Sequence, residues 1–106
     1  MKRPRVEILY FEGCPHYEDA RALVERLAAG LGIDPDLQLV EVPDEQAATR
    51  LRFLGSPSVR VEGCDVEPGA DERSAYVLSG RLYRGQRGLS GAPDEGWIRD
   101  ALTAAV

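Results

Sequence analysis

Cysteine, histidine and long apolar runs are all scarce in this 106-residue chain. It holds two cysteines and one histidine, too few for a structural zinc site within one chain, which usually takes ~4 such ligands. No stretch approaches the ~18 consecutive apolar residues of a membrane span. The short N-terminal apolar run carries Glu7 and Glu12, unlike the apolar core of a secretory signal peptide. We therefore expect a cytoplasmic protein with no membrane partner, no resident metal and no cofactor.

Positive charge is also in the minority. The chain has 13 Lys and Arg against 18 Asp and Glu, a net charge of −5, so nucleic acid is not an expected partner. The exception is the basic segment 1–5, which predicts a solvated tail or, alternatively, a docking arm. An apolar share of 43% is ordinary for a globular protein. With no repeat and no long linker, residues 1–106 are expected to form a single domain.

The apolar pattern predicts the element order β-α-β-α-β-β-α. Strands are expected at 5–11, 37–42, 58–62 and 65–67, and helices at 15–30, 43–54 and 93–105. Prolines at 15, 43 and 93 suit the first turns of these helices. A strand, a helix and a strand in sequence imply a parallel pair with a right-handed crossover, to which the late hairpin adds antiparallel strands. Residues 68–92 are interpreted as an insertion, part loop and part strand or short helix.

The motif with the most chemical content is Cys14-Pro15-His16-Tyr17, between the first strand and the first helix. A helix start favours an anion, so a thiolate at Cys14 is expected to be stabilised. A Cys-x-x-Cys redox motif would carry its second thiol at position 17, where this chain has Tyr17. Two-thiol exchange within the motif is therefore excluded. The alternative for Cys14 is a small buried apolar residue at a helix start.

The neighbours of Cys14 have their own alternatives. His16 either stabilises the thiolate when protonated or is an exposed helix residue. Tyr17 is expected to pack and to shield the thiol, since a phenol is a poor base at neutral pH. Cys64, expected in a tight turn, stands seven residues after Pro57. At ~3.3 Å per residue it lies on the order of 20 Å away, well beyond the ~6 Å Cα separation of a disulfide. A Cys14–Cys64 bond is disfavoured, and Cys64 is a surface thiol or a site of intermolecular disulfide or glutathione capping.

Several charged residues also need an interpretation. Arg81, Arg84 and Arg87 recur every three residues. They predict a solvated charged face or, alternatively, contacts to an acidic ligand such as a glutathione carboxylate. The acidic residues of the same region are expected to be solvated: Asp65, Glu67, Asp71 and Glu72.

The element order, a cysteine after the first strand and a proline opening the third strand resemble the thioredoxin fold. The resemblance covers residues 5–67 and the final helix. Cys14-Pro15-His16 is similar to the start of the Cys-Pro-His-Cys motif of bacterial disulfide-oxidising members. The resemblance implies an α/β thioredoxin-like fold with a mixed four-stranded sheet flanked by helices. It also implies a cis peptide bond before Pro57, uncommon at ~5% of X–Pro bonds, with Cys14 against the Ser56-Pro57 backbone.

In function, the resemblance implies a monothiol thiol–disulfide oxidoreductase. Cys14 would attack a thiol- or disulfide-containing small molecule or protein, with His16 and Pro57 assisting, and an external thiol such as glutathione would resolve the adduct. The substrate-binding residues implied are Pro15, Tyr17, Ser56 and Ser58. Two alternatives stay open: a redox-inactive thioredoxin-fold binding module, and a thiolate-based binder of soft metals such as mercury, completed in an oligomer. The oligomeric state is not predicted.

Overall fold

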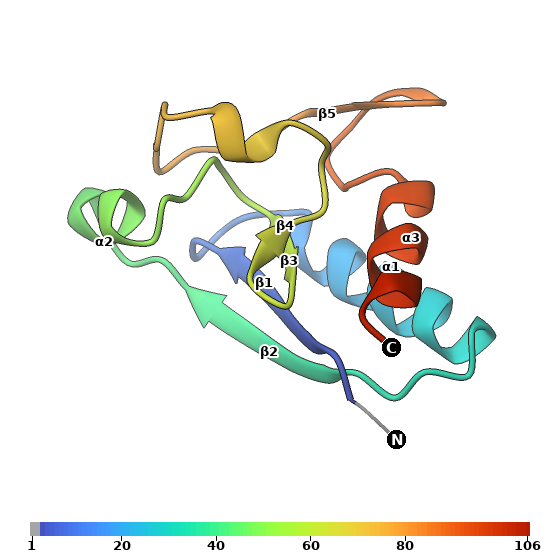
Figure 1. Cartoon of the computed structure of the whole chain (residues 1–106). Coiled ribbons are helices and arrows are strands. Elements are labelled where there is room, and N and C mark those ends of the chain that lie inside the picture. The colour runs from blue at the N-terminus through green and yellow to red at the C-terminus, as the bar shows by residue number, and fades with distance from the viewer. Residues whose placement is uncertain (1–2) are drawn as a thin grey trace.

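The computed structural model describes residues 3–106 and contains the predicted order of elements, with additions between the fourth strand and the last helix (Figure 1). The elements are β1 (Arg5–Tyr10), α1 (Tyr17–Gly30), β2 (Asp36–Glu41), α2 (Glu45–Arg50), β3 (Ser58–Val61), β4 (Cys64–Asp65), the 3-10 helix η1 (Ala70–Glu72), β5 (Tyr83–Gly85), β6 (Gly88–Ser90) and α3 (Glu95–Ala104). Within the described chain, no helix is long and apolar enough to cross a membrane.

The main sheet is mixed and has four strands in the order β2-β1-β3-β4. β1 pairs in parallel with β2 and antiparallel with β3, and β4 pairs antiparallel with β3. Leu9 lies opposite Ser58 and Val6 lies opposite Val61. β3 therefore starts beside the carboxyl end of β1 and runs back toward its amino end. The predicted α/β class with a mixed four-stranded sheet is confirmed.

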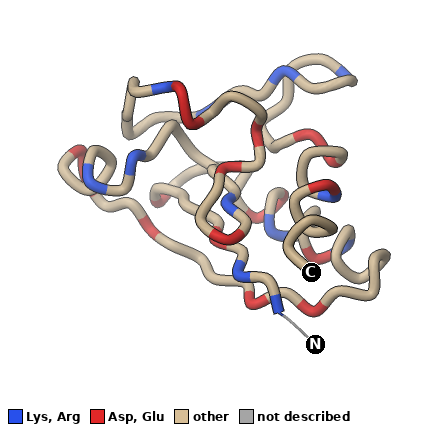
Figure 2. The backbone as a smooth tube through the Cα atoms, in the orientation of Figure 1, with Lys and Arg blue, Asp and Glu red and all other residues tan. Residues whose placement is uncertain are grey.

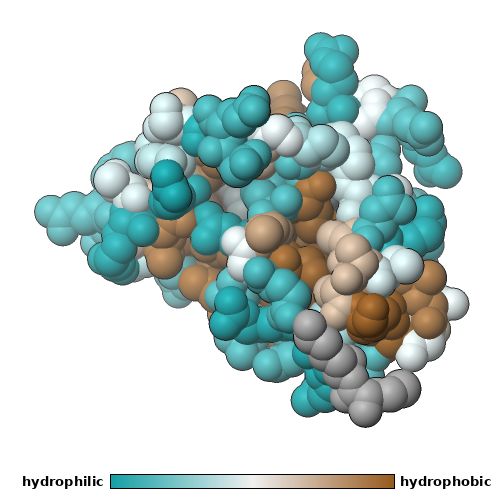
Figure 3. All heavy atoms as spheres, in the orientation of Figure 1, coloured by the Kyte–Doolittle hydropathy of each residue, from teal (hydrophilic) through white to brown (hydrophobic). Residues whose placement is uncertain are grey.

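Helices cover both faces of this sheet, as the almost continuous apolar run of β1 predicts. α1 and α3 pack on one face around a buried cluster that includes Val6, Ile8, Val24, Leu27, Ile98 and Leu102. α2 and the residues after it cover the other face, where Leu9 packs with Val42, Ala48 and Phe53. The outer edge of the first cluster reaches the surface between the β3–β4 hairpin and α3, in an open groove of about 600 Å³ (Figure 3).

The helix boundaries follow local caps, and each helix starts two residues later than predicted, while α2 also ends four residues earlier and α3 one residue earlier. Asp44 accepts a hydrogen bond from Ala47 N and caps α2, and Asp94 accepts one from Gly96 N and caps α3, as acids at helix starts predict. α1 begins at Tyr17 instead of Pro15, because residues 15–16 form a turn with His16 as N-cap. α2 ends at Arg50, because the chain reverses into a left-handed conformation at Arg52 (φ 57°).

The β3–β4 hairpin turns one residue earlier than predicted. Glu62 and Gly63 have φ of 52° and 84°, the left-handed values that a tight two-residue hairpin loop requires. Cys64 therefore lies in β4, opposite Val61, and the prediction that it belongs to the turn is wrong.

Two segments of uncertain structure in the sequence are now defined. Residues 68–92 contain η1, an irregular stretch and a separate two-stranded sheet, β5–β6. In the basic N-terminal segment Arg3 and Arg5 are exposed, as expected for solvated residues, while Pro4 is buried and Arg5 begins β1. The expectation of a free tail is therefore wrong from Pro4 onward. Met1 and Lys2 lie outside the described residues.

Candidate functional site

Cys14 lies in the turn that links β1 to α1. Its backbone N–H donates to Phe11 O at 3.1 Å, which closes the turn. Its side chain is buried, with 6% of the residue surface exposed, while Pro15 and His16 beside it are exposed. The Cys14 side chain is therefore shielded by protein on most sides.

His16 occupies the N-cap position of α1, without a capping hydrogen bond from its side chain, and touches the segment that precedes α3. Its Nδ1 lies 3.5 Å from Asp19 Oδ2, an ion pair when the ring is protonated. The ring also packs on the backbone of Gly91, where an added Cβ would lie 2.6 Å from His16 Cδ2. The residues after β6 are thus brought against the residue two positions after Cys14, a contact that the sequence did not predict.

Tyr17 packs as expected. It is half-buried, and its ring stacks on that of Tyr10 with centroids 4.2 Å apart and planes 13° from parallel. Since Tyr10 is the last residue of β1, this stack ties the start of α1 to the end of the strand. Shielding of the thiol by Tyr17 stays a prediction.

The proline loop, residues 55–58, lies at the same end of the sheet as the Cys14 turn. The Ser56–Pro57 peptide bond is cis, which confirms the expectation from the sequence. Ser58 opposes Leu9, so Pro57 precedes that pair beside the carboxyl end of β1, the end from which the chain continues to Cys14. Direct contact between Cys14 and Pro57 stays a prediction. Ser56, Pro57 and Ser58 are all buried.

Residues 79–83 hold the proline loop through its backbone. Ser56 N donates to Ser79 O at 2.8 Å, and Arg81 N donates to Ser56 O at 2.9 Å. The hydroxyl of Tyr83 donates to Pro57 O. Because both backbone polar groups of Ser56 are engaged within the chain, an extended substrate cannot pair with them while this segment stays in place.

The serine side chains of the loop were expected to bind substrate, and the structure engages one of them internally. Ser58 Oγ donates to Gly55 O at 2.6 Å and accepts from Arg81 Nη1 at 2.9 Å. Ser56 Oγ is buried and has no hydrogen-bond partner within residues 3–106. Of the four residues implied to bind substrate, Pro15 and Tyr17 are the ones with exposed or half-buried side chains.

Arg81 is buried beneath the proline loop, where the sequence suggested a solvated face. Its guanidinium contacts Asp65 at 2.7 Å and Glu67 at 2.7 Å, and its side chain is 1% exposed. It also lies over the ring of Tyr83, 4.4 Å from the centroid. The expectation of solvation is wrong for Arg81, Asp65 and Glu67. The sequence held one indication of this cluster: Asp65 and Glu67 are two residues apart in an expected strand, so their side chains point to the same side.

Burial and pairing fix the protonation of this cluster. Burial alone lowers the pKa of Arg81, but the hydrogen bonds that Arg81 donates to Asp65 and Glu67, with the charge of Asp65, raise it above its ordinary value. Burial raises the pKa of Tyr83, so its hydroxyl stays protonated and available as a donor to Pro57 O. At neutral pH the cluster is a charged arginine between two carboxylates, beside a neutral phenol.

Cys64 lies at the opposite end of the sheet from Cys14. It opposes Val61, which opposes Val6 near the start of β1, so β3 leads away from the Cys14 turn as expected. Cys64 is exposed and Cys14 buried, and both are free thiols. Cys64 therefore does not supply the second sulfur that the motif lacks.

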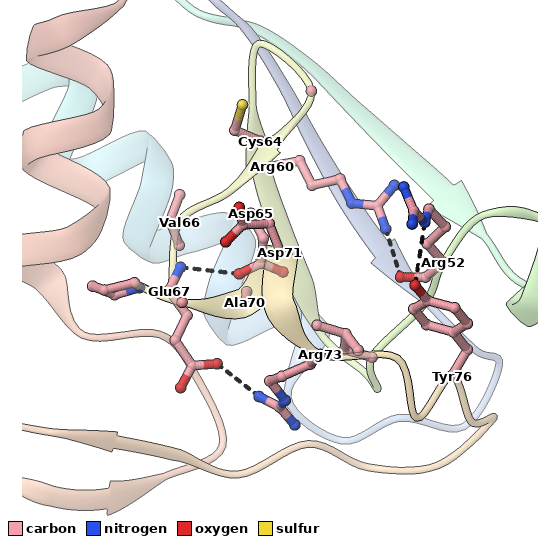
Figure 4. Close-up of a pocket in the computed structure, with 14 residues that line it drawn as sticks. Arg52, Arg60, Cys64, Asp65, Val66, Glu67, Ala70, Asp71, Arg73 and Tyr76 are labelled. Atoms are coloured by element: carbon pink, nitrogen blue, oxygen red, sulfur yellow. Dashed lines mark hydrogen bonds and ion pairs between the residues drawn. The ribbon is translucent and has the colours of Figure 1, made fainter.

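A hollow of about 450 Å³ lies beside Cys64, between the β3–β4 hairpin and η1 (Figure 4). Its polar groups mostly bond to one another: Arg60 donates to Leu51 O and Arg52 O, and Arg52 donates to the Tyr76 hydroxyl. Figure 4 shows the Cys64 side chain directed away from Arg52 and Tyr76. The thiol and the arginines of this hollow do not converge on one point.

Metal ligands and relatives add no further site. Among the described residues, no three His, Cys, Asp or Glu side chains gather closely enough to hold a metal ion.

No protein-family model matches the chain, and no curated protein matches it in sequence. The argument for function therefore starts from the Cys14 turn and the proline loop.

Proposed function

We propose that this chain is a thioredoxin-like protein that exchanges thiols and disulfides through one cysteine, Cys14. The observation that carries the proposal is the position of Cys14 relative to Pro57. Cys14 follows the carboxyl end of β1, and Pro57 stands beside that same end of the strand. A cysteine and a proline loop at one end of a mixed sheet agree with the thioredoxin-like resemblance of the sequence.

The proposed reaction is a balanced exchange. The Cys14 thiol loses its proton to solvent, and the thiolate attacks one sulfur of a disulfide R–S–S–R′. A Cys14–S–S–R bond forms as the R–S–S–R′ bond breaks, and the departing R′ thiolate takes up a proton. An external thiol such as glutathione, as its thiolate, then attacks the sulfur of R. It forms a disulfide with R and releases Cys14, so the step involves no net oxidation.

The residues around Cys14 have different parts in this proposal. His16, when protonated, favours the thiolate through its charge. Pro57 shapes the surface beside the thiol. Pro15 and Tyr17 line the approach to it, since their side chains are exposed and half-buried. The residues of the Arg81 cluster act through the proline loop and do not touch substrate.

A second candidate function follows from the burial of Cys14. A thiol with 6% of its residue surface exposed is poorly placed for attack on a bulky disulfide, and free cysteine is often a small buried hydrophobe. The chain would then be a redox-inactive thioredoxin-fold binding module. The two functions differ in whether any disulfide turns over.

The test is exchange of a mixed disulfide with glutathione, followed for the wild type, Cys14→Ser and Cys64→Ser. We expect turnover by the wild type and by Cys64→Ser and background rates for Cys14→Ser. Background rates for all three proteins would refute the exchange function and leave the binding module. Far-ultraviolet circular dichroism of each variant shows whether the fold is retained.

A further inference from the structure

The β5–β6 hairpin presents an apolar and cationic face to solvent. Successive residues of a strand point to opposite sides, so buried Tyr83 leaves Leu82 and Arg84 on the outside. Leu89 lies directly opposite Arg84 and therefore shares its side. Leu82 is 67% exposed and Leu89 61% exposed. These residues form the outer hairpin face: Leu82, Arg84 and Leu89. Arg87 lies in the connecting turn at the edge of this face and lines the hollow toward α3.

The hairpin is anchored at three points. Tyr83 is fully buried beneath it. Gln86 N donates to Asp94 Oδ2 at 2.9 Å, which ties the turn to the N-cap of α3. Gly91, just after β6, packs on His16. Because Tyr83 and the contact of Gly85 with Asp94 occupy the inner side, the two leucines stay exposed on the outer side.

The charge of this segment is opposite to that of the protein. Residues 73–93 contain four arginines and no acidic residue, in a chain of net charge −5. Arg73 and Arg81 pair with carboxylates. Neither Arg84 nor Arg87 forms a close ion pair with any described residue, although the charge of Arg87 is among the minor causes that lower the pKa of Asp94. Figure 2 shows the hairpin at the upper right with basic positions and no acidic ones.

The outer hairpin face adjoins the Cys14 turn. Gly91 contacts His16, two residues from the thiol. A hollow of about 360 Å³ also lies between the hairpin and α3, with Leu23, Arg87 and Arg99 in its lining. A partner seated on the face therefore has room for a side chain and lies near Cys14.

We propose that the outer hairpin face docks an acidic polypeptide segment that carries an apolar side chain and presents a disulfide to Cys14. The inference rests on the proposed exchange function and names its substrate class. Carboxylates would pair with Arg84 and Arg87, and the apolar side chain would cover Leu82 and Leu89. The backbone of Ser56 is engaged by residues 79–81, so affinity for an extended partner has to come from another surface.

Charge and apolar surface together select this occupant. The net charge of −5 disfavours large polyanionic surfaces such as nucleic acid and anionic bilayers, which meet much of the protein, more than a short acidic segment that meets only the basic hairpin. Phosphates would also leave Leu82 and Leu89 uncovered. Free glutathione has carboxylates but no apolar side chain for the leucines. An acidic polypeptide with an apolar side chain can pair with the arginines and also cover the leucines.

Docking is tested apart from the chemistry, with Cys14→Ser protein and two fluorescent peptides. One peptide alternates Glu with Leu, and the other alternates Lys with Leu at the same length. The protein variants are Arg84→Glu/Arg87→Glu, Leu82→Ser/Leu89→Ser and the control Arg5→Glu/Arg50→Glu, which reverses two exposed arginines elsewhere. The control matches the change in net charge, so a difference between the charge variants reports the location of binding.

We expect the acidic peptide to bind and the basic one not to. The Arg84→Glu/Arg87→Glu change should weaken binding of the acidic peptide about tenfold, and this loss of affinity should grow as the salt concentration is lowered. The Leu82→Ser/Leu89→Ser variant should also bind the acidic peptide more weakly. The control pair should change it less than about threefold. Equal losses in both charge variants, or tighter binding to phosphatidylserine vesicles or to an oligonucleotide than to the acidic peptide, would overturn the proposal.

A second arm separates this proposal from the exchange function. Wild-type protein receives the same two peptides, each with one added cysteine that is joined to glutathione as a mixed disulfide. Faster exchange of the acidic peptide, lost in Arg84→Glu/Arg87→Glu, supports docking of the substrate on the hairpin. Binding without any exchange refutes the proposed function alone, and equal exchange of both peptides refutes the docking alone.

Discussion

The hydroxyl of Tyr83 donates a hydrogen bond to the carbonyl oxygen of Pro57, and both residues are buried. Tyr83 begins β5, in the segment that the sequence marked as an insertion, and Pro57 belongs to the loop beside the Cys14 turn. The bond therefore makes the segment 68–92 part of the support of the candidate site. Its inner side positions the proline loop, while its outer side is free for a partner.

Replacing Tyr83 by Phe removes this hydrogen bond and keeps the ring. Pro57 O is left without its donor in a buried setting, so we expect a loss of about 1–2 kcal/mol in the free energy of unfolding. Urea denaturation measures it. Tyr76→Phe is the matched control, because Tyr76 is half-buried and its hydroxyl accepts from exposed Arg52. If Tyr83→Phe and Tyr76→Phe lower the free energy of unfolding equally, the Tyr83–Pro57 hydrogen bond does not stabilise the fold more than an exposed one.

Replacing Arg81 by Met removes the cation that Asp65 and Glu67 share, and leaves Glu67 with Arg73 as its remaining ion-pair partner. Removal of one partner from a buried ion cluster costs about 3–5 kcal/mol, and this change should be the most destabilising of the set. Arg84→Met, at an exposed position, should cost less than about 0.5 kcal/mol. Adding Asp65→Asn and Glu67→Gln to Arg81→Met should recover part of the loss. A triple variant no more stable than the single one would contradict the charge argument.

Replacing Gly91 by Ala tests the contact between the β6–α3 connection and His16. The new Cβ would lie 2.6 Å from His16 Cδ2, so the exposed imidazole has to move. The chain has one histidine, so its ring signals in an NMR spectrum are unambiguous, and they should shift in Gly91→Ala. Gly80→Ala is the control, because nothing lies within 4 Å of a Cβ at that position. Unchanged His16 signals in Gly91→Ala would show that the contact is absent in solution.

The carboxylate of Asp94, which accepts from Gln86 N and Gly96 N, should make the thermal stability of the fold depend on pH. Hydrogen bonds from Gln86 N and then Gly96 N lower the pKa of Asp94 below its ordinary value of 3.8. A carboxyl with a lowered folded pKa stabilises the fold above its unfolded pKa, and the contribution is lost as the pH falls through the folded pKa. Asp94→Asn should therefore flatten the decline of the melting temperature below about pH 4. Asp100→Asn, at an exposed position in α3, should leave the decline unchanged, and the same flattening there would contradict the assignment.

The regular elements were predictable because their signals are local. The apolar run of β1, the spacing of Val24 and Leu27 in α1, and acids at Asp44 and Asp94 each depend on a few neighbouring residues. The start of α1 was misplaced because a proline suits a turn before a helix as well as its first turn.

The Arg81 cluster was not predictable because its parts are far apart in sequence. The alternation of Asp65 and Glu67 indicates a shared side, but no local pattern names a partner 14 and 16 residues away. The segment between them has no helical or strand periodicity over most of its length, so its path back to the proline loop could not be followed. The hairpin leucines, Leu82 and Leu89, and the lack of acidic residues in 73–93 are visible in the sequence. The exposure of the leucines and their common face depend on the β5–β6 register.

The central claim, that Cys14 is the reacting thiol, is tested most directly by the order in which the two cysteines form a mixed disulfide. Cys64 is exposed and Cys14 is buried, so accessibility alone favours Cys64. With limiting disulfide reagent and mass spectrometry of the digested protein, the account predicts that Cys14 is labelled first in the folded chain. In urea the two should react at similar rates. Preferential labelling of Cys64 in the folded protein, with Cys14 reacting only on unfolding, would contradict the account.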